Sequence, residues 1–175
     1  SATAFVSHVG GGWQNTASGY LSQVAGGWKN TAGGYAATVS GGSANVVGGY
    51  AAVVSGGIGN IAANEYAVVG GGLTNSANSR YATVGGGRGN TASGIGAFVG
   101  GGSQHPESQT VANNAASGTF STVVAGTSNT ASGEYSVVGG GWDNRALGYS
   151  SLVSGGWDNS AAGDMSSIGG GWMNT

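Results

Sequence analysis

Asparagine recurs every fifteen residues along nearly the whole chain, and this period constrains the fold more than any other feature. The register breaks once, between Asn90 and Asn114, where nine extra residues enter, and it then resumes without slipping. A repeat this short cannot bury a core alone, so each repeat must be one coil of a stacked structure. The column consists of Asn15, Asn30, Asn45, Asn60, Asn75, Asn90, Asn114, Asn129, Asn144, Asn159 and Asn174.

Other columns accompany the asparagines. In the regular coils Gly stands three residues before the Asn, and Val (Ile168 in one coil) stands three residues before that Gly. A Ser or Ala lies two residues before the Val, and Ala lies two residues after the Asn, with Val47 as the exception. Fixed residues therefore alternate in two segments, small-x-Val and Asn-x-Ala, and a period of two is typical of β-strands.

The glycine clusters between these segments favour tight turns or positive φ angles, which double the chain back. We therefore expect an all-β protein, a parallel β-roll (β-solenoid) of about eleven fifteen-residue coils, each with two short strands and two bends. Residues 1–175 would form a single β-roll. Its lumen must be thin, since Ala, Ser, Gly and Val fill the fixed columns.

The repeated asparagines are expected to be structural. A buried amide must be hydrogen-bonded. Stacked identical amides can bond to one another and to the backbone of the turns. We therefore interpret the column as a ladder that holds the turns, and not as eleven ligand-binding positions.

Composition excludes several classes of protein. The chain has 40 glycines and only ten charged residues among 175, but its Val columns and aromatic residues do not fit a disordered linker. It has no cysteine, which excludes disulfides and thiolate metal sites. The net charge of −2 gives no footprint for nucleic acid or anionic lipid, and no apolar run reaches membrane-spanning length. No nucleophile–base pair or phosphate loop is present, so we expect neither catalysis nor a cofactor.

Association with other copies is expected, because one coil buries little apolar surface for the number of residues that it orders. The residue just before the Val column carries no charge and is often apolar, whereas the residue after the Asn tolerates Arg145. Our hypothesis is that the outer face of the first strand packs against neighbouring subunits. The residues assigned to that interface are Val53, Val68, Phe98, Val137 and Leu152.

The coil pattern V-x-G-G-x-x-N-x-A-x-G-x-Y-S/A resembles the repeats of YadA-like head domains in trimeric autotransporter adhesins. The segments VGGGWQNTASGYLSQVAGG and TVGGGRGNTASG carry the resemblance, which is closest to heads of the ubiquitous surface protein adhesins. The commonest family pattern has Ser or Ala where Asn stands here.

The resemblance implies a left-handed roll and a homotrimer on the bacterial cell surface, outside the outer membrane. It implies cell adhesion and a role in virulence. The adhesion would be to a host extracellular-matrix or cell-surface ligand (protein or glycan) or to other bacteria. A stalk and an outer-membrane anchor would lie on other parts of a longer chain, so this segment would not itself insert into the membrane. The chain starts and stops inside the repeat, in keeping with a head fragment.

Tryptophan is the first candidate for ligand binding. All five tryptophans occupy one column, two residues before the Asn, in two clusters: Trp13, Trp28, Trp142, Trp157 and Trp172. They either fill grooves between subunits and coils, or form an exposed aromatic ladder that binds sugars or a protein. Two partial aromatic columns lie elsewhere in the coil: Tyr20, Tyr35, Tyr50 and Tyr149, and one place later Tyr66, Tyr81, Phe120 and Tyr135. Packing of the turns is the favoured role of these rings, and contact with a ligand is the alternative.

The insertion is the second candidate. Residues 103–113 contain the only proline and are expected to form a surface loop, where binding functions tend to evolve on rigid scaffolds. His105 and Glu107 are the candidate binding residues there, but two side chains do not make a metal site, and we expect no metal.

Three other functions remain open. One alternative is a receptor-binding or shaft segment of a phage or secreted fibre. The flanking domains would distinguish this alternative from an adhesin head. An ice-binding protein would need a regular Thr array, whereas Val46, Ile61, Ala115 and Arg145 interrupt the Thr column. A glycan-degrading fibre enzyme would need a pair of carboxylates on adjacent coils.

Overall fold

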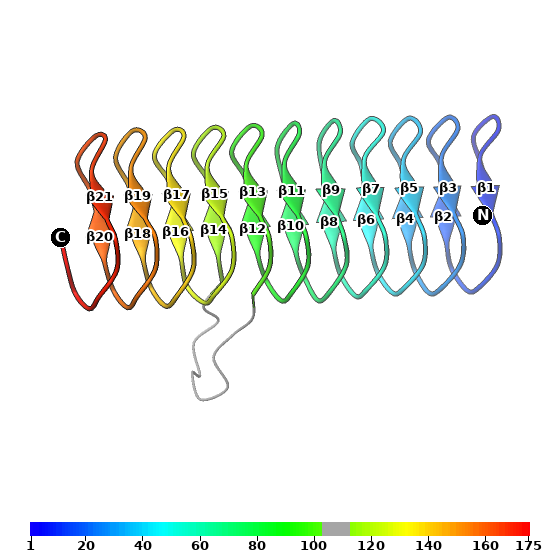
Figure 1. Cartoon of the computed structure of the whole chain (residues 1–175). Helices are drawn as coiled ribbons and strands as arrows, with labels where there is room; N and C mark the ends of the chain where they lie inside the picture. Colours follow the sequence, from blue (N-terminus) through cyan, green and yellow to red (C-terminus); the bar gives the residue numbers. More distant parts are fainter. Residues whose placement is uncertain (103–112) are drawn as a thin grey trace.

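Each sequence repeat forms one coil of a parallel β-solenoid, which confirms the predicted fold class (Figure 1). The structure is a computed structural model and describes residues 1–102 and 113–175. The coils lie side by side in one row, with the N-terminus at one end and the C-terminus at the other. Each coil contributes one two-residue strand to each of two sheets, of eleven and ten strands.

The odd-numbered strands contain the Val column and form the eleven-stranded sheet. They are β1 His8–Val9, β3 Gln23–Val24, β5 Thr38–Val39, β7 Val53–Val54, β9 Val68–Val69, β11 Thr83–Val84, β13 Phe98–Val99, β15 Thr122–Val123, β17 Val137–Val138, β19 Leu152–Val153 and β21 Ser167–Ile168.

The even-numbered strands begin directly after each Asn and form the ten-stranded sheet. They are β2 Thr16–Ala17, β4 Thr31–Ala32, β6 Val46–Val47, β8 Ile61–Ala62, β10 Ser76–Ala77, β12 Thr91–Ala92, β14 Ala115–Ala116, β16 Thr130–Ala131, β18 Arg145–Ala146 and β20 Ser160–Ala161.

Strand register follows the sequence columns. Val24 pairs with Val39 in one sheet, and Ala17 pairs with Ala32 in the other. The pairing continues across the insertion, where Thr91 pairs with Ala115. The backbone N–H of Asn114 still donates to Oδ1 of Asn90, at 3.3 Å. The extra residues therefore leave the stacking register of the coils unchanged.

The core is a narrow file of small side chains between the two sheets. The Val column from Val24 to Val153 and the Ala column from Ala17 to Ala146 are fully buried, and Val is the largest side chain among them. Parallel strands stack at about 4.8 Å, so identical side chains meet identical side chains in neighbouring coils. Such a lumen has no room for a side chain much larger than Val, as the composition of the fixed columns predicts.

The two bends of each coil differ. We call the segment between the fixed Val and the Asn the glycine bend (25–29 in one coil), and the segment between the fixed Ala and the small residue the aromatic bend (33–36). The glycine bends line the lower edge of Figure 1 and the aromatic bends line the upper edge. Each bend has a left-handed corner that is mostly occupied by non-glycine residues, as at Lys29 (φ 55°) and Ala36 (φ 52°), although Gly59, Gly89 and Gly96 occupy it in some coils.

A third parallel ladder runs through the glycine bends and was not predicted. Single-residue bridges join the tryptophan column from coil to coil, as in Trp13↔Trp28, Trp28↔Ser43 and Leu73↔Arg88. The coil therefore has the two expected strands and, in addition, a short third contact between them. This ladder forms with Trp, Ser or Arg in the column, so the backbone of the glycine bend does not depend on the side chain there.

Candidate binding surfaces

The asparagine column forms a continuous buried hydrogen-bonded ladder. In a central coil, Nδ2 of Asn60 donates to the carbonyl oxygens of Gly56 (2.9 Å) and Gly72 (3.0 Å). Its Oδ1 accepts the backbone N–H of Asn75 at 2.9 Å. Both polar atoms of the amide are therefore occupied, and the side chain is fully buried. This arrangement leaves the amide no atom to offer a ligand.

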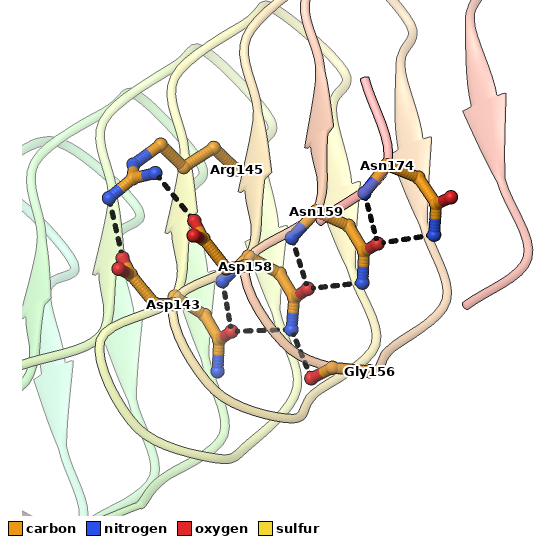
Figure 2. Close-up of polar contacts among 8 residues, drawn as sticks. Asp143, Arg145, Gly156, Asp158, Asn159 and Asn174 are labelled. Carbon is orange, nitrogen blue, oxygen red and sulfur yellow. Dashed lines mark hydrogen bonds and ion pairs between the residues drawn. The ribbon is translucent and has the colours of Figure 1, made fainter. Parts of the chain in front are cut away.

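The same ladder gains direct amide–amide bonds toward the C-terminus. Nδ2 of Asn159 donates to Oδ1 of Asn144 at 3.0 Å, and Nδ2 of Asn174 donates to Oδ1 of Asn159 at 2.8 Å. Figure 2 shows these bonds running from one coil to the next. In these coils each amide therefore also binds the amide of the preceding coil directly.

The tryptophans lie on the outside of the glycine bends in two stacked clusters. Trp142 and Trp157 stack with ring centroids 5.1 Å apart, and Trp157 and Trp172 with centroids 5.4 Å apart. Trp13 and Trp28 stack at 6.3 Å near the other end, with Nζ of Lys29 at 4.5 Å from the Trp28 ring centroid. Trp13 is 64% exposed and Trp172 is 63% exposed, so both clusters present apolar surface to solvent.

Stacking determines which parts of these rings a partner can touch. The planes of Trp142 and Trp157 are inclined by only 2°, so the facing sides of these two rings cover each other. A sugar that stacks on an aromatic face therefore finds little free face between the rings. Ring edges along the ladder and the outward face of Trp172 remain accessible. This geometry favours a partner that packs across the edges of several rings.

Asp143, Arg145 and Asp158 form an ionic cluster (Figure 2), and its two carboxylates directly follow Trp142 and Trp157 in the sequence. The guanidinium of Arg145 lies 2.7 Å from Oδ1 of Asp143 and 3.2 Å from Oδ1 of Asp158. The two carboxylates occupy the same column in adjacent coils, where they would repel each other, and Arg145 compensates both. Because all three side chains are partly exposed, the pairs contribute little to stability and mainly set the local charge.

The aromatic bends carry a stack that joins the two partial aromatic columns. Tyr20, Tyr35 and Tyr50 stack from coil to coil with centroid distances of 5.2 and 5.1 Å. The stack then passes to Tyr66, one place later in its coil, through an edge-to-face contact of 5.5 Å. Sequence reasoning treated these columns separately. The two columns occupy neighbouring positions at one left-handed corner. This adjacency indicates that a ring from either position can reach the same stack.

The outer face of the odd-numbered sheet carries no charged residue. The outward residues of β1 to β21 are His8, Gln23, Thr38, Val53, Val68, Thr83, Phe98, Thr122, Val137, Leu152 and Ser167. Val53 and Val68 are partly exposed, and Phe98 and Leu152 are exposed. The outer face of the even-numbered sheet carries Arg145 but also exposes Val46 and Ile61. The interface residues predicted from the sequence thus share one uncharged surface, separate from the tryptophans.

The insertion enters at a glycine bend. Gly102 takes the place of the glycine that stands three residues before the Asn in regular coils, because its carbonyl accepts the N–H of Arg88. At the other end of the insertion, Asn113 directly precedes the ladder residue Asn114. The described residues at its two ends, Gly102 and Asn113, therefore belong to the edge that carries the tryptophans. His105 and Glu107, the candidate binding residues of the predicted loop 103–113, lie outside the described residues.

Ionisable side chains are sparse in residues 1–102 and 113–175. This part of the chain contains no group of three His, Cys, Asp or Glu side chains placed to hold a metal ion. It also contains no helix long and apolar enough to cross a membrane. Its charged side chains are scattered over the two bends and the even-numbered sheet.

Comparison with known proteins adds no family assignment. No protein-family model matches the chain, and no curated protein sequence matches it. The surfaces described above are therefore the basis for a functional interpretation.

Proposed function

We propose that this β-solenoid is a non-enzymatic adhesion module that acts as a homotrimer on the bacterial cell surface, as in the YadA-like heads that its repeats resemble. Its ligand would be a protein or glycan of the host matrix, of a cell surface or of another bacterium. The resemblance in sequence motifs and the parallel β-solenoid architecture both support this proposal.

The tryptophan column carries the proposal. Ser43, Arg88 and Thr127 occupy the same column without interrupting the described backbone bridges on either side of the insertion. The fold therefore does not require tryptophan there, yet large apolar rings are kept at solvent-exposed positions. Exposed aromatic side chains clustered on a rigid scaffold are typical of binding surfaces.

Binding is tested with the double variant Trp142→Ala/Trp157→Ala. The wild-type protein, immobilised or displayed on cells, is first screened against a panel of matrix proteins and glycans. We expect the variant to lose at least tenfold in affinity for the bound partner while its unfolding midpoint stays within a few degrees. The double variant Trp13→Ala/Trp28→Ala makes the same substitution in the other tryptophan cluster and is the matched control. Large loss of stability without loss of binding would show that the rings serve packing.

Trimer formation is tested on the uncharged face. A carboxylate at Val53 or Val68 would be buried without a partner if this face packs between subunits, which is costly. We expect Val53→Glu and Val68→Glu to dissociate the oligomer, as measured by sedimentation velocity. Thr31→Glu, on the outer face of the other sheet, is the control and should leave the oligomer intact. Unchanged assembly of the Val53 and Val68 variants would contradict the assignment.

A further inference from the structure

Every tyrosine of the chain lies in the stack on the aromatic bends. Its seven tyrosines are Tyr20, Tyr35, Tyr50, Tyr66, Tyr81, Tyr135 and Tyr149. Each has another tyrosine as a direct neighbour, with ring centroids between 5.1 Å (Tyr35–Tyr50) and 5.8 Å (Tyr135–Tyr149). Tyr20 to Tyr81 form one run across five coils, and Tyr135 and Tyr149 form a separate pair.

These phenol rings are open to reagents in solution. Tyr35 is 42% exposed and Tyr81 is 54% exposed, and the other five lie between these values. About half of each tyrosine is exposed, so rotation about its side-chain bonds is not blocked by a packed core. The ordered backbone beneath keeps neighbouring tyrosines at the spacing of adjacent coils. The arrangement thus holds pairs of phenols close together while leaving them accessible.

From this geometry we propose that the tyrosine stack is a site of oxidative dityrosine cross-linking between consecutive coils. The oxidant is hydrogen peroxide used by a haem peroxidase, which removes one electron and one proton from each of two phenols. The two phenoxyl radicals couple through a carbon–carbon bond ortho to their oxygens. The ring hydrogens at the two coupled carbons then move to the oxygens and restore both phenols. Overall, two tyrosines and one hydrogen peroxide give one dityrosine and two water molecules.

Competing chemistry in the chain is limited. There is no cysteine to reduce a tyrosyl radical or to form a disulfide instead. The tryptophans, which are also oxidisable, lie on the glycine bends at the opposite edge of each coil. A radical formed on Tyr20 or Tyr35 therefore has a stacked phenol in the next coil, and a radical on Tyr50 has the edge-to-face ring of Tyr66 there.

Such cross-links would fasten neighbouring coils covalently. A bond between Tyr20 and Tyr35 closes a loop of one coil, and restricting the unfolded chain in this way stabilises the folded state, as a disulfide does. The inference is independent of the proposed adhesive function, because it depends only on the positions of the tyrosines.

The test treats the purified protein, at low concentration, with a haem peroxidase and limiting hydrogen peroxide. We expect blue dityrosine fluorescence, a mass decrease of about 2 Da per cross-link from the loss of two hydrogens, and a higher unfolding midpoint. Peptide mapping should find neighbours in the stack, such as Tyr20–Tyr35 and Tyr66–Tyr81. Absence of dityrosine, or equal yields of distant pairs such as Tyr20–Tyr149, would overturn the proposal.

Matched variants locate the reaction. Tyr35→Phe keeps a ring in the stack but removes its phenol, so both cross-links of Tyr35 should disappear while Tyr66–Tyr81 remains. Tyr149→Phe should remove only the Tyr135–Tyr149 product. Denaturing electrophoresis distinguishes bonds within one chain from bonds between copies. If all dityrosine joins separate chains, the coil-to-coil assignment is wrong.

Discussion

The two bends of each coil perform the same geometric task by different means. The glycine bend is held by a buried amide whose donors and acceptor are all used, as at Asn60. The aromatic bend is held on its outside by rings that stack at the surface, as at Tyr35. At the first bend the Asn and the Gly three residues before it recur in every regular coil, whereas the ring position of the second bend accepts Glu65, Arg80 or Ile95 in place of Tyr. The position that does not vary is therefore the one whose buried polar groups must be hydrogen-bonded.

Backbone strain does not explain this difference. Both bends contain a non-glycine residue in the left-handed region, such as Gln14 (φ 56°) in one and Leu21 (φ 58°) in the other. Each such residue costs of order 1–3 kcal/mol and persists because the surrounding ladder fixes it. What distinguishes the glycine bend is the buried amide together with a recurring glycine of positive φ such as Gly27, because close approach between coils occurs in both bends. Four changes, ordered by expected size, test this comparison.

The largest effect is expected for Gly27→Ala in the glycine bend. Gly27 has φ 97°, and a Cβ there would lie 2.1 Å from the carbonyl oxygen of Gly42 in the next coil. Strain and overpacking together should lower the free energy of unfolding by about 4 kcal/mol. Urea unfolding followed by circular dichroism measures the change. Gly26→Ala is the control, since a Cβ at Gly26 meets nothing within 4 Å. If Gly27→Ala and Gly26→Ala lowered the free energy of unfolding equally, close approach of the next coil would not be the cause.

Removing one amide should have the next largest effect. Asn60→Ala leaves the N–H of Asn75 and the carbonyl of Gly56 without their side-chain partner, whereas the carbonyl of Gly72 still accepts the N–H of Ile58. Two unsatisfied groups and a small cavity should cost about 3 kcal/mol in the free energy of unfolding.

The control for that change is Asn64→Ala. Asn64 is exposed, and its Nδ2 donates to the carbonyl of Asn78, which water can replace. Its loss should change the free energy of unfolding by less than about 1 kcal/mol. Hydrogen exchange at Asn75 would localise the effect of Asn60→Ala to the ladder. Unchanged protection of that amide would contradict the hydrogen-bonding argument.

A smaller effect is expected at the aromatic bend. Tyr35→Ala removes two stacking contacts, with Tyr20 and Tyr50, each worth about 0.5–1.5 kcal/mol, from a half-exposed position. The free energy of unfolding should fall by about 1–2 kcal/mol. Tyr35→Phe keeps the ring and should be nearly neutral in the same urea titration. A loss as large as that of Asn60→Ala would erase the distinction between the bends.

The sequence predicted what the period imposes and missed single-residue backbone pairing and the direction in which rings point. Fixed columns at Val24 and Ala17 predicted strands, stacking and a thin core, because identical residues one period apart must meet in neighbouring coils. The bridges at Trp28 and Ser43 were missed, since a single paired residue leaves no alternating pattern. The passage of the stack from Tyr50 to Tyr66 was missed as well, because columns describe positions along the chain and not the direction of rings. The binding partners of the exposed tryptophans are other molecules, and the repeated columns of this sequence carry no information about them.

The smallest expected effect has the opposite sign and concerns the end of the aromatic bend. The hydroxyl of Ser136 is buried without a hydrogen-bond partner, in a column where Ala37 and Ala52 are equally buried. Ser136→Ala should therefore raise the free energy of unfolding by about 1 kcal/mol, because it removes an unsatisfied polar group and leaves no large cavity. Ser166→Ala is the matched control in the same column, since its hydroxyl donates to the carbonyl of Gly163 at 2.6 Å. Stabilisation at Ser136 and none at Ser166 would show that this bend, unlike the glycine bend, contains polar groups that the fold does not use. Destabilisation by Ser136→Ala would instead mean that the buried hydroxyl contributes a bond of its own.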